Sequence, residues 1–115
     1  MADTASHRLR TKEVEYLLTA LRAVESNDEL FDFLLDVCTP REMIEMAQRL
    51  EVARLLTGGA AYTAIEAATG ASATTIARVS KCLQFGNTGY EGVLLKLREM
   101  EETEGRSARP ASSKD

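Results

Sequence analysis

The sequence predicts an all-α protein of about six helices, because apolar residues recur at every third or fourth position, the spacing of one helix face. No segment shows the two-residue alternation that is typical of a half-buried strand. Aromatic residues make up only 5% of the chain, so the core is expected to be aliphatic. A length of 115 residues is enough for one domain with a modest core.

Two helices are expected in the first third of the chain. The first covers about residues 9–25, where apolar side chains follow a single stripe. The second covers about residues 29–37, after a break at Asn27 or Asp28, and is apolar almost all round, so it must be covered on several sides. Residues 1–8 are polar and are expected to form a flexible N-terminal arm.

The clearest helix start in the sequence is a Thr-Pro-Arg-Glu tetrapeptide. Thr39 is a good N-cap, Pro40 fits the first helical position, and Glu42 completes a capping box. We expect this third helix to end near residue 57, before two consecutive glycines that can adopt a positive φ.

Two short helices joined by a glycine turn are expected over residues 62–85. The first ends at Gly70, and the second begins near Ala73 with Ser72 as its N-cap. Their apolar spacing is what a helix-turn-helix needs to lock its two helices together. The apolar positions are Ile65, Ala71, Ile76 and Val79.

The last expected helix covers about residues 90–102, after a loop at 86–89. It carries an apolar stripe on one face. Residues 104–115 are rich in Ser and Arg and lack apolar periodicity, so they are expected to form a disordered tail. The helical domain is therefore expected to span residues 9–103.

The composition argues against an enzyme or a metalloprotein. The only histidine, His7, lies in the polar N-terminal segment, so a histidine-based catalytic or metal site is not expected. Cys38 and Cys82 lack the spacing of a zinc site or a disulfide framework, and are interpreted as small buried hydrophobic residues. No glycine-rich phosphate-binding motif is present, so we expect no catalytic residue, metal or cofactor.

Charge and hydropathy indicate where the protein is located and which partners it can bind. The longest apolar run is far below the ~18 residues of a membrane span, and no signal-peptide pattern opens the chain, so a cytoplasmic location without a membrane partner is expected. The formal net charge is −4, from 14 basic and 18 acidic residues. Binding to DNA would therefore need a local basic patch.

The second helix of the helix-turn-helix has such features. Its first turn carries small hydroxyl side chains that let a helix N-terminus approach phosphates and base edges. Arg78 and Lys81, one turn further, can reach phosphate or guanine. Residues 62–84 hold these two cations against Glu66, a net charge of +1 that predicts modest affinity. A basic N-terminal cluster could add phosphate contacts, or be an ordinary solvated segment; it consists of His7, Arg8, Arg10 and Lys12.

Several stretches between residues 34 and 97 together resemble a known family. They are Leu34-Leu35, Cys38-Thr39-Pro40-Arg41-Glu42, Leu55-Leu56-Thr57-Gly58, Ile65, Gly70-Ala71-Ser72 and Thr75-Ile76-Ala77-Arg78. Two more stretches resemble a subgroup of that family: Gln48-Arg49-Leu50-Glu51-Val52-Ala53 and Gly86-Asn87-Thr88-Gly89-Tyr90. The chain thus resembles the Trp repressor superfamily, and within it the shorter Trp-repressor-related proteins of bacteria.

This resemblance implies an interlocked, all-helical homodimer that binds double-stranded operator DNA through its helix-turn-helix. It also implies that the second helix of this unit enters the major groove. Together with the charge pattern, it gives the expected DNA-binding residues as Ser72, Ala73, Thr74, Thr75, Ala77, Arg78 and Lys81.

The effector site of the family is only partly matched. Trp repressor holds tryptophan between two arginines; Arg78 matches one of them and Arg49 is nearest to the other. A glycine follows the second arginine in Trp repressor, whereas Val79 stands here and its branched side chain would fill the space beside the indole. Thr63 and Glu66 replace basic residues of the family. Tryptophan is therefore not expected as co-repressor, while another small acid between the two arginines remains an alternative.

Dimerisation also follows from the apolar pattern, since six short helices of one chain cannot cover the apolar faces of the second and third helices. The sequence thus predicts a homodimeric, sequence-specific DNA-binding transcriptional regulator, and more narrowly a repressor. The alternative is a structural or protein-binding dimer that shares the fold but does not bind DNA. Glu66 and the acidic residues near the end of the last helix favour that alternative; these are Glu99, Glu101, Glu102 and Glu104.

Overall fold

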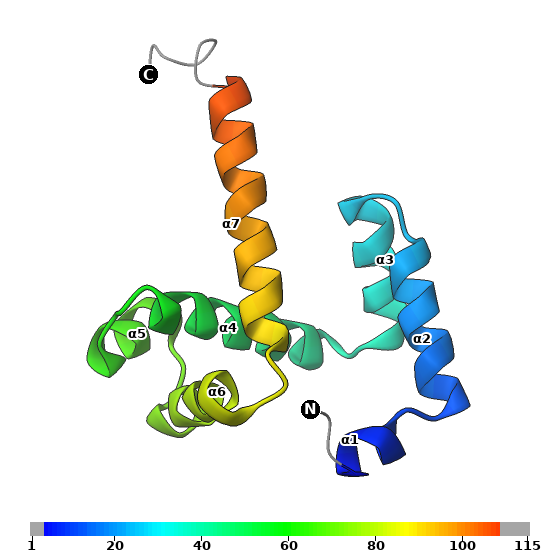
Figure 1. The fold of residues 1–115 in the computed structure, drawn as a ribbon, viewed down its shortest axis with the longest axis horizontal. Coiled ribbons are helices and arrows are strands. Elements are labelled where there is room, and N and C mark those ends of the chain that lie inside the picture. The colour runs from blue at the N-terminus through cyan, green and yellow to red at the C-terminus, as the bar shows by residue number, and fades with distance from the viewer. Residues whose placement is uncertain (1–3, 109–115) are drawn as a thin grey trace. The chain divides into compact units, whose positions relative to one another are not determined.

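The structure, a computed structural model, describes residues 4–108 and contains seven helices and no strand within that range (Figure 1). The expectation of an all-α fold is confirmed. The helices are α1 (Thr4–Leu9), α2 (Lys12–Ala23), α3 (Asn27–Val37), α4 (Pro40–Thr57), α5 (Tyr62–Thr69), α6 (Ala73–Phe85) and α7 (Gly89–Ala108). The chain divides into two compact units, an N-terminal unit up to Gln48 and a C-terminal unit from Arg49, and the division falls within α4.

Side-chain caps determine where the helices of the N-terminal unit begin. The Thr11 hydroxyl accepts a hydrogen bond from the backbone N–H of Val14 at 3.1 Å, so α2 begins at Lys12 and not near Leu9. The Ser26 hydroxyl likewise accepts from Glu29 at 3.1 Å, so α3 begins two residues before the expected Glu29. Ser26, Asn27 and Asp28 are all favourable N-caps, and local sequence does not decide between them.

The capping box expected at the start of α4 is confirmed. The Thr39 hydroxyl accepts from the backbone N–H of Glu42 at 3.1 Å. The Glu42 carboxylate in turn accepts from the backbone N–H of Thr39 at 2.8 Å. Two N–H groups that a helix start leaves without partners are thereby satisfied reciprocally.

The two ends of the described chain are more helical than expected. The short helix α1, Thr4–Leu9, covers the second half of the segment 1–8 expected to be a flexible arm, and α7 continues to Ala108 instead of ending near Glu102. The added residues are Thr103 to Ala108; Glu104, Arg106 and Ala108 have high helix propensity, whereas the residues between them favour a helix less. Residues 1–3 of the expected arm and 109–115 of the expected tail lie outside the described residues.

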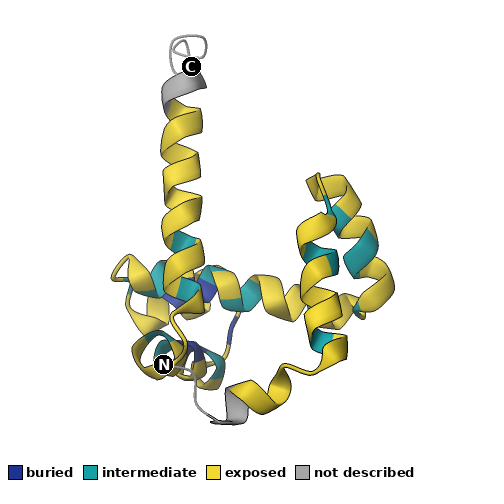
Figure 2. Cartoon of the chain, turned by 45° about the vertical axis from the view of Figure 1, so that its right-hand side comes forward, coloured by how far each residue is buried: buried dark blue, intermediate teal, exposed yellow. Residues whose placement is uncertain are grey.

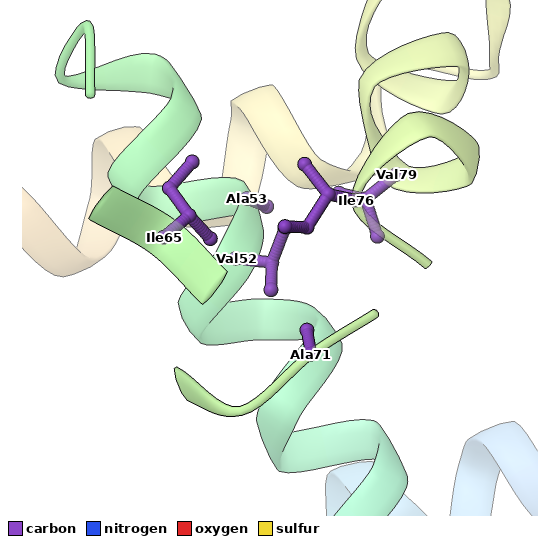
Figure 3. Packing of buried hydrophobic residues seen from close by; sticks show 6 residues of the cluster. All are labelled: Val52, Ala53, Ile65, Ala71, Ile76 and Val79. Carbon is purple, nitrogen blue, oxygen red and sulfur yellow. The ribbon is translucent and has the colours of Figure 1, made fainter. Parts of the chain in front are cut away.

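The aliphatic core of the C-terminal unit joins α4, α5 and α6, whose side chains point toward one another (Figure 3). All residues that are buried in the described part of the chain belong to this core. They are Val52 and Ala53 of α4, Ile65 of α5, Ala71 of the turn, and Ile76 and Val79 of α6. The four apolar positions expected to lock the helix-turn-helix are thus all confirmed as core residues.

In the N-terminal unit, α2 and α3 are both fully described and contain no buried residue (Figure 2). Val14, Leu21 and Phe33 are half-buried, whereas Tyr16 is 80% and Phe31 52% exposed. An α3 that is apolar nearly all round is therefore covered only in part within one chain, as its sequence suggested.

Candidate nucleic-acid interface

A left-handed glycine links the two helices of the helix-turn-helix. Gly70 follows α5 with a φ of +75°, and its N–H donates to the carbonyl oxygen of Glu66 at 2.9 Å. A Cβ at this position would meet nothing within 4 Å, so the positive φ, and not lack of space, favours glycine here. The Thr69 hydroxyl accepts from the N–H of Ala71 at 3.1 Å, which orders the turn, and Ala71 is only 4% exposed.

Ser72 caps α6 in the way the sequence predicts. Its hydroxyl oxygen accepts from the backbone N–H of Thr75 at 3.1 Å. The same hydroxyl donates to the Thr75 hydroxyl oxygen at 3.2 Å. The two side chains at the start of α6 are therefore bonded to each other as well as to the helix end.

The helix α6 has two different faces. Ile76 and Val79 are buried against α4 and α5 (Figure 3). Leu83 is partly buried and packs against the same core. The outward face of α6 consists of exposed residues on the other side of the helix, namely Ala73, Thr74, Ala77, Arg78 and Lys81. The structure therefore brings five of the seven predicted DNA-binding residues together on one surface, with Ser72 exposed at its edge and Thr75 half-buried beside it.

The charge on this surface is small, as the sequence indicates. Arg78 and Lys81 are both exposed on α6, and Glu66 is exposed on α5. Elsewhere in the same unit, Arg54 donates to the Glu51 carboxylate at 2.9 Å along α4. These hydrogen bonds lower the pKa of Glu51 and raise the pKa of Arg54, so this arginine is already paired with a carboxylate.

Of the basic N-terminal cluster, Arg10 is engaged within the protein. Its guanidinium donates to both carboxylate oxygens of Glu15, one of them at 3.1 Å, and this lowers the pKa of Glu15. His7, Arg8 and Lys12 are exposed. The sequence places all four basic side chains in one segment, but in the folded chain Arg10 pairs with a carboxylate one turn into α2.

The family becomes clear from comparison with known proteins. Residues 12–98 match the family model described as Trp repressor protein. The chain belongs to the Trp repressor family. The match extends from the start of α2 into α7 and therefore includes the helix-turn-helix.

Relatives in this family resemble the chain over most of their length. The uncharacterized protein YerC of Bacillus subtilis is 44% identical over 100 residues, which is 87% of this chain and 95% of YerC. A TrpR-like protein from Eubacterium eligens is 42% identical, with a TM-score of 0.77 over 79% of this chain and 94% of that protein. A proposed Trp repressor from Staphylococcus aureus is 34% identical, with a TM-score of 0.80 over 84% and 96% of the two chains.

The two arginines that the family resemblance suggests for an effector site lie on two helices of the C-terminal unit. Arg49 is half-buried on α4, and Arg78 is exposed on α6. Val79 stands where Trp repressor has glycine, and it is 1% exposed as part of the core. Its side chain thus occupies volume that a glycine would leave empty.

One feature of the surface escaped sequence reasoning. A hollow of about 520 Å³ lies between α4, α6 and the start of α7, and Leu50, Leu83 and Val93 line it. Cys82 also lines this hollow and is exposed, so its interpretation as a buried residue is wrong; Cys38 is half-buried. The apolar lining comes from three helices, and spacing along a single helix therefore could not reveal it.

Two further expectations concern other classes of site. Among the described residues, no three His, Cys, Asp or Glu side chains gather in a way that could hold a metal ion. None of the described helices combines the length and the apolar character that crossing a membrane requires.

Proposed function

We propose that this member of the Trp repressor family is a homodimeric, sequence-specific DNA-binding transcriptional regulator, and that it acts as a repressor. The observation that carries the proposal is the outward face of α6, which is free of core contacts and lies on a capped, glycine-turned helix pair. In a helix-turn-helix, the corresponding helix enters the major groove. The proposed setting is the cytoplasm, and the proposed partner is double-stranded operator DNA.

The side chains of α6 suit different parts of the duplex. The Arg78 guanidinium can donate two parallel hydrogen bonds to guanine O6 and N7, or bind a phosphate. Lys81, nearly one turn further from the helix start, suits a phosphate oxygen as a compact charge. Because Glu66 offsets one of these charges, each copy would bind weakly, and two linked copies would be needed for useful affinity.

The exposed apolar side chains support a homodimer. Large apolar residues are exposed on α2, α3, the first half of α4 and α7. Large exposed apolar patches mark sites of interaction with other proteins. A second copy related by a two-fold axis would cover them and would set two α6 helices about 34 Å apart, one turn of DNA. The exposed residues include Leu17, Leu18, Phe31, Leu35, Ile44, Val93 and Met100.

The test of DNA binding is selection from random duplexes followed by affinity measurement at several salt concentrations. Affinity should fall steeply as salt rises, because bound phosphates release counterions. Arg78→Ala should weaken binding about 10-fold or more if the arginine reads a base, or lower the salt slope by about 1 if it holds a phosphate. Arg22→Ala, on the exposed surface of α2, is the matched control and should change neither. Failure to bind any duplex at low salt would contradict the proposal.

A small acidic effector held by Arg49 and Arg78 is a second part of the proposal. The two arginines support it, while the buried Val79 argues that the effector is not tryptophan. Thermal shift measurements with amino acids and small carboxylates would test it. A ligand that raises the melting temperature of the wild-type protein, but not that of Arg49→Ala, is the expected result.

A dimer that binds proteins instead of DNA is the alternative function. Glu66 on α5 and the exposed acidic side chains of α7 favour it, since both repel a phosphate backbone. This alternative predicts that the protein captures other proteins from a lysate while selection from random duplexes yields no sequence. A palindromic DNA sequence recovered by selection would rule in favour of the regulator.

A further inference from the structure

Two of the three hydroxyl groups at the start of α6 are used inside the protein, whereas Thr74 is exposed on the outward face. The Ser72 hydroxyl caps the helix and donates its proton to Thr75, whose side chain is half-buried. To donate to a base, the Ser72 hydroxyl would have to break its hydrogen bond to Thr75. Ser72 and Thr75 therefore serve mainly to hold the start of α6 in shape.

Three methyl groups lie on the outward face near the helix start, two from alanines and one from Thr74, which also carries a hydroxyl. Ala73 and Ala77 are four residues apart, and Thr74 and Ala77 are three apart, so their side chains lie on one side of the helix. All three are exposed, whereas Ile76 and Val79 are buried. Arg78 stands next to this methyl surface, which we define as Ala73, Thr74 and Ala77.

We propose that this methyl surface recognises the C5-methyl groups of thymines in the operator half-site. The inference rests on the proposed DNA-binding function and names the chemistry that it reads. Thymine carries the one methyl group that a base displays in the major groove, and the side it occupies distinguishes T·A from A·T. Alanine methyls and the threonine γ-methyl are the usual apolar partners of that group. A net charge of only +1 on residues 62–84 limits the sequence-independent attraction to phosphates, so contacts with base edges supply a larger share of the affinity.

The half-site is accordingly expected to combine thymines with a neighbouring guanine. Thymines would lie beneath the methyl surface, and the guanine would face Arg78. Each methyl–methyl contact should be worth about fourfold in affinity, the effect of burying one methyl-sized group.

The experiment uses the full chain and a duplex obtained by selection from random DNA. Each thymine of one half-site is replaced in turn by uracil, which removes the methyl group and leaves every hydrogen-bonding atom in place. Affinity is measured for the wild type, for Thr74→Ser, and for Thr103→Ser as a control on the exposed surface of α7. Serine at 74 keeps the hydroxyl and removes only the γ-methyl group.

The expected result is a loss of about fourfold for one or more central uracils, with flanking uracils showing no effect. At the thymine that Thr74 contacts, Thr74→Ser should abolish the penalty for uracil, whereas Thr103→Ser should retain it. Equal binding with uracil at every position of the selected duplex would overturn methyl recognition. Readout of the bases through bridging water would give this result. That outcome would leave the regulator proposal standing, whereas a failure to select any duplex would contradict the regulator proposal itself.

Discussion

The backbone N–H of Gly86 donates to the carbonyl oxygen of Cys82 at 2.8 Å and closes the end of α6. A Cβ on residue 86 would lie 2.5 Å from that oxygen and 3.2 Å from its carbonyl carbon. Both are backbone atoms, so no change of side-chain rotamer relieves the overlap. Glycine at this position thus allows the chain to turn away from α6 toward α7.

Gly86→Ala should therefore lower the free energy of unfolding by about 1–3 kcal/mol, the usual cost of forcing extra atoms into a filled space. The matched control is Gly92→Ala, inside α7, where an added Cβ meets nothing within 4 Å. That substitution should raise the free energy of unfolding by about 0.5–1 kcal/mol, because glycine is a poor residue in a helix. Urea denaturation of the three proteins measures both effects, and equal changes in the two variants would contradict the steric argument.

Substitutions at Ser72 should separate stability from DNA binding. Ser72→Ala removes the cap of α6 and should cost about 1 kcal/mol of stability. Ser72→Asp keeps an oxygen acceptor for the N–H of Thr75, so stability should be close to that of the wild type. The aspartate nevertheless places a negative charge beside the DNA phosphates and should weaken binding. Denaturation and anisotropy titrations check the two properties, and an aspartate variant that binds DNA as well as the wild type would argue against insertion of this helix end.

Val79 should contribute to the stability of the protein as a core residue, in the absence of any effector. Because its side chain is buried among Val52, Ile65 and Ile76, Val79→Ala should lower the free energy of unfolding by about 2 kcal/mol. Free tryptophan should leave the melting temperature of the wild-type protein unchanged, since the space beside Arg78 that a glycine would open is filled. Scanning calorimetry with and without tryptophan measures both, and a clear rise with tryptophan would contradict the argument that Val79 excludes it.

Acid should remove the contribution of the two charged pairs to stability. Arg54 lowers the pKa of Glu51, and Arg10 lowers the pKa of Glu15. A folded-state pKa below the unfolded value means that each pair stabilises the protein above the ordinary carboxylate pKa, and that this is lost as the pH falls through the lowered value. Glu51→Gln should therefore be slightly less stable than the wild type at pH 7 and equally stable in acid. A difference that persists at the lowest pH would show that the glutamine acts through something other than charge.

Local chemistry made much of the fold predictable. Thr39 with Glu42, and Ser72 before α6, are caps whose partners lie within three residues, so the sequence alone specifies them. The buried face of the helix-turn-helix followed in the same way, because the spacing of Ile65, Ala71 and Ile76 fits one glycine-turned arrangement. The outward face of α6 was then what remained.

Other features depend on backbone geometry and side-chain rotamers that the local sequence does not determine. Ser26, and not Asn27 or Asp28, caps α3. All three residue types are favourable N-caps, so the backbone geometry decides which of them serves. The bond between the Ser72 and Thr75 hydroxyls and the pairing of Arg10 with Glu15 depend on side-chain rotamers. Whether the outward face of α6 contacts DNA is a property of the complex and stays a prediction.

The absence of any buried residue from α2 and α3 bears on how long a lone molecule survives. Segments with few buried contacts open at low free energy, so their amide protons exchange and their peptide bonds are cut before those of a well-packed helix such as α6. A second molecule that covers these helices would shield them from proteases. The concentration of the protein in the cell would then govern its rate of degradation as well as the occupancy of its DNA site. At low concentration, single molecules would be degraded before they formed dimers.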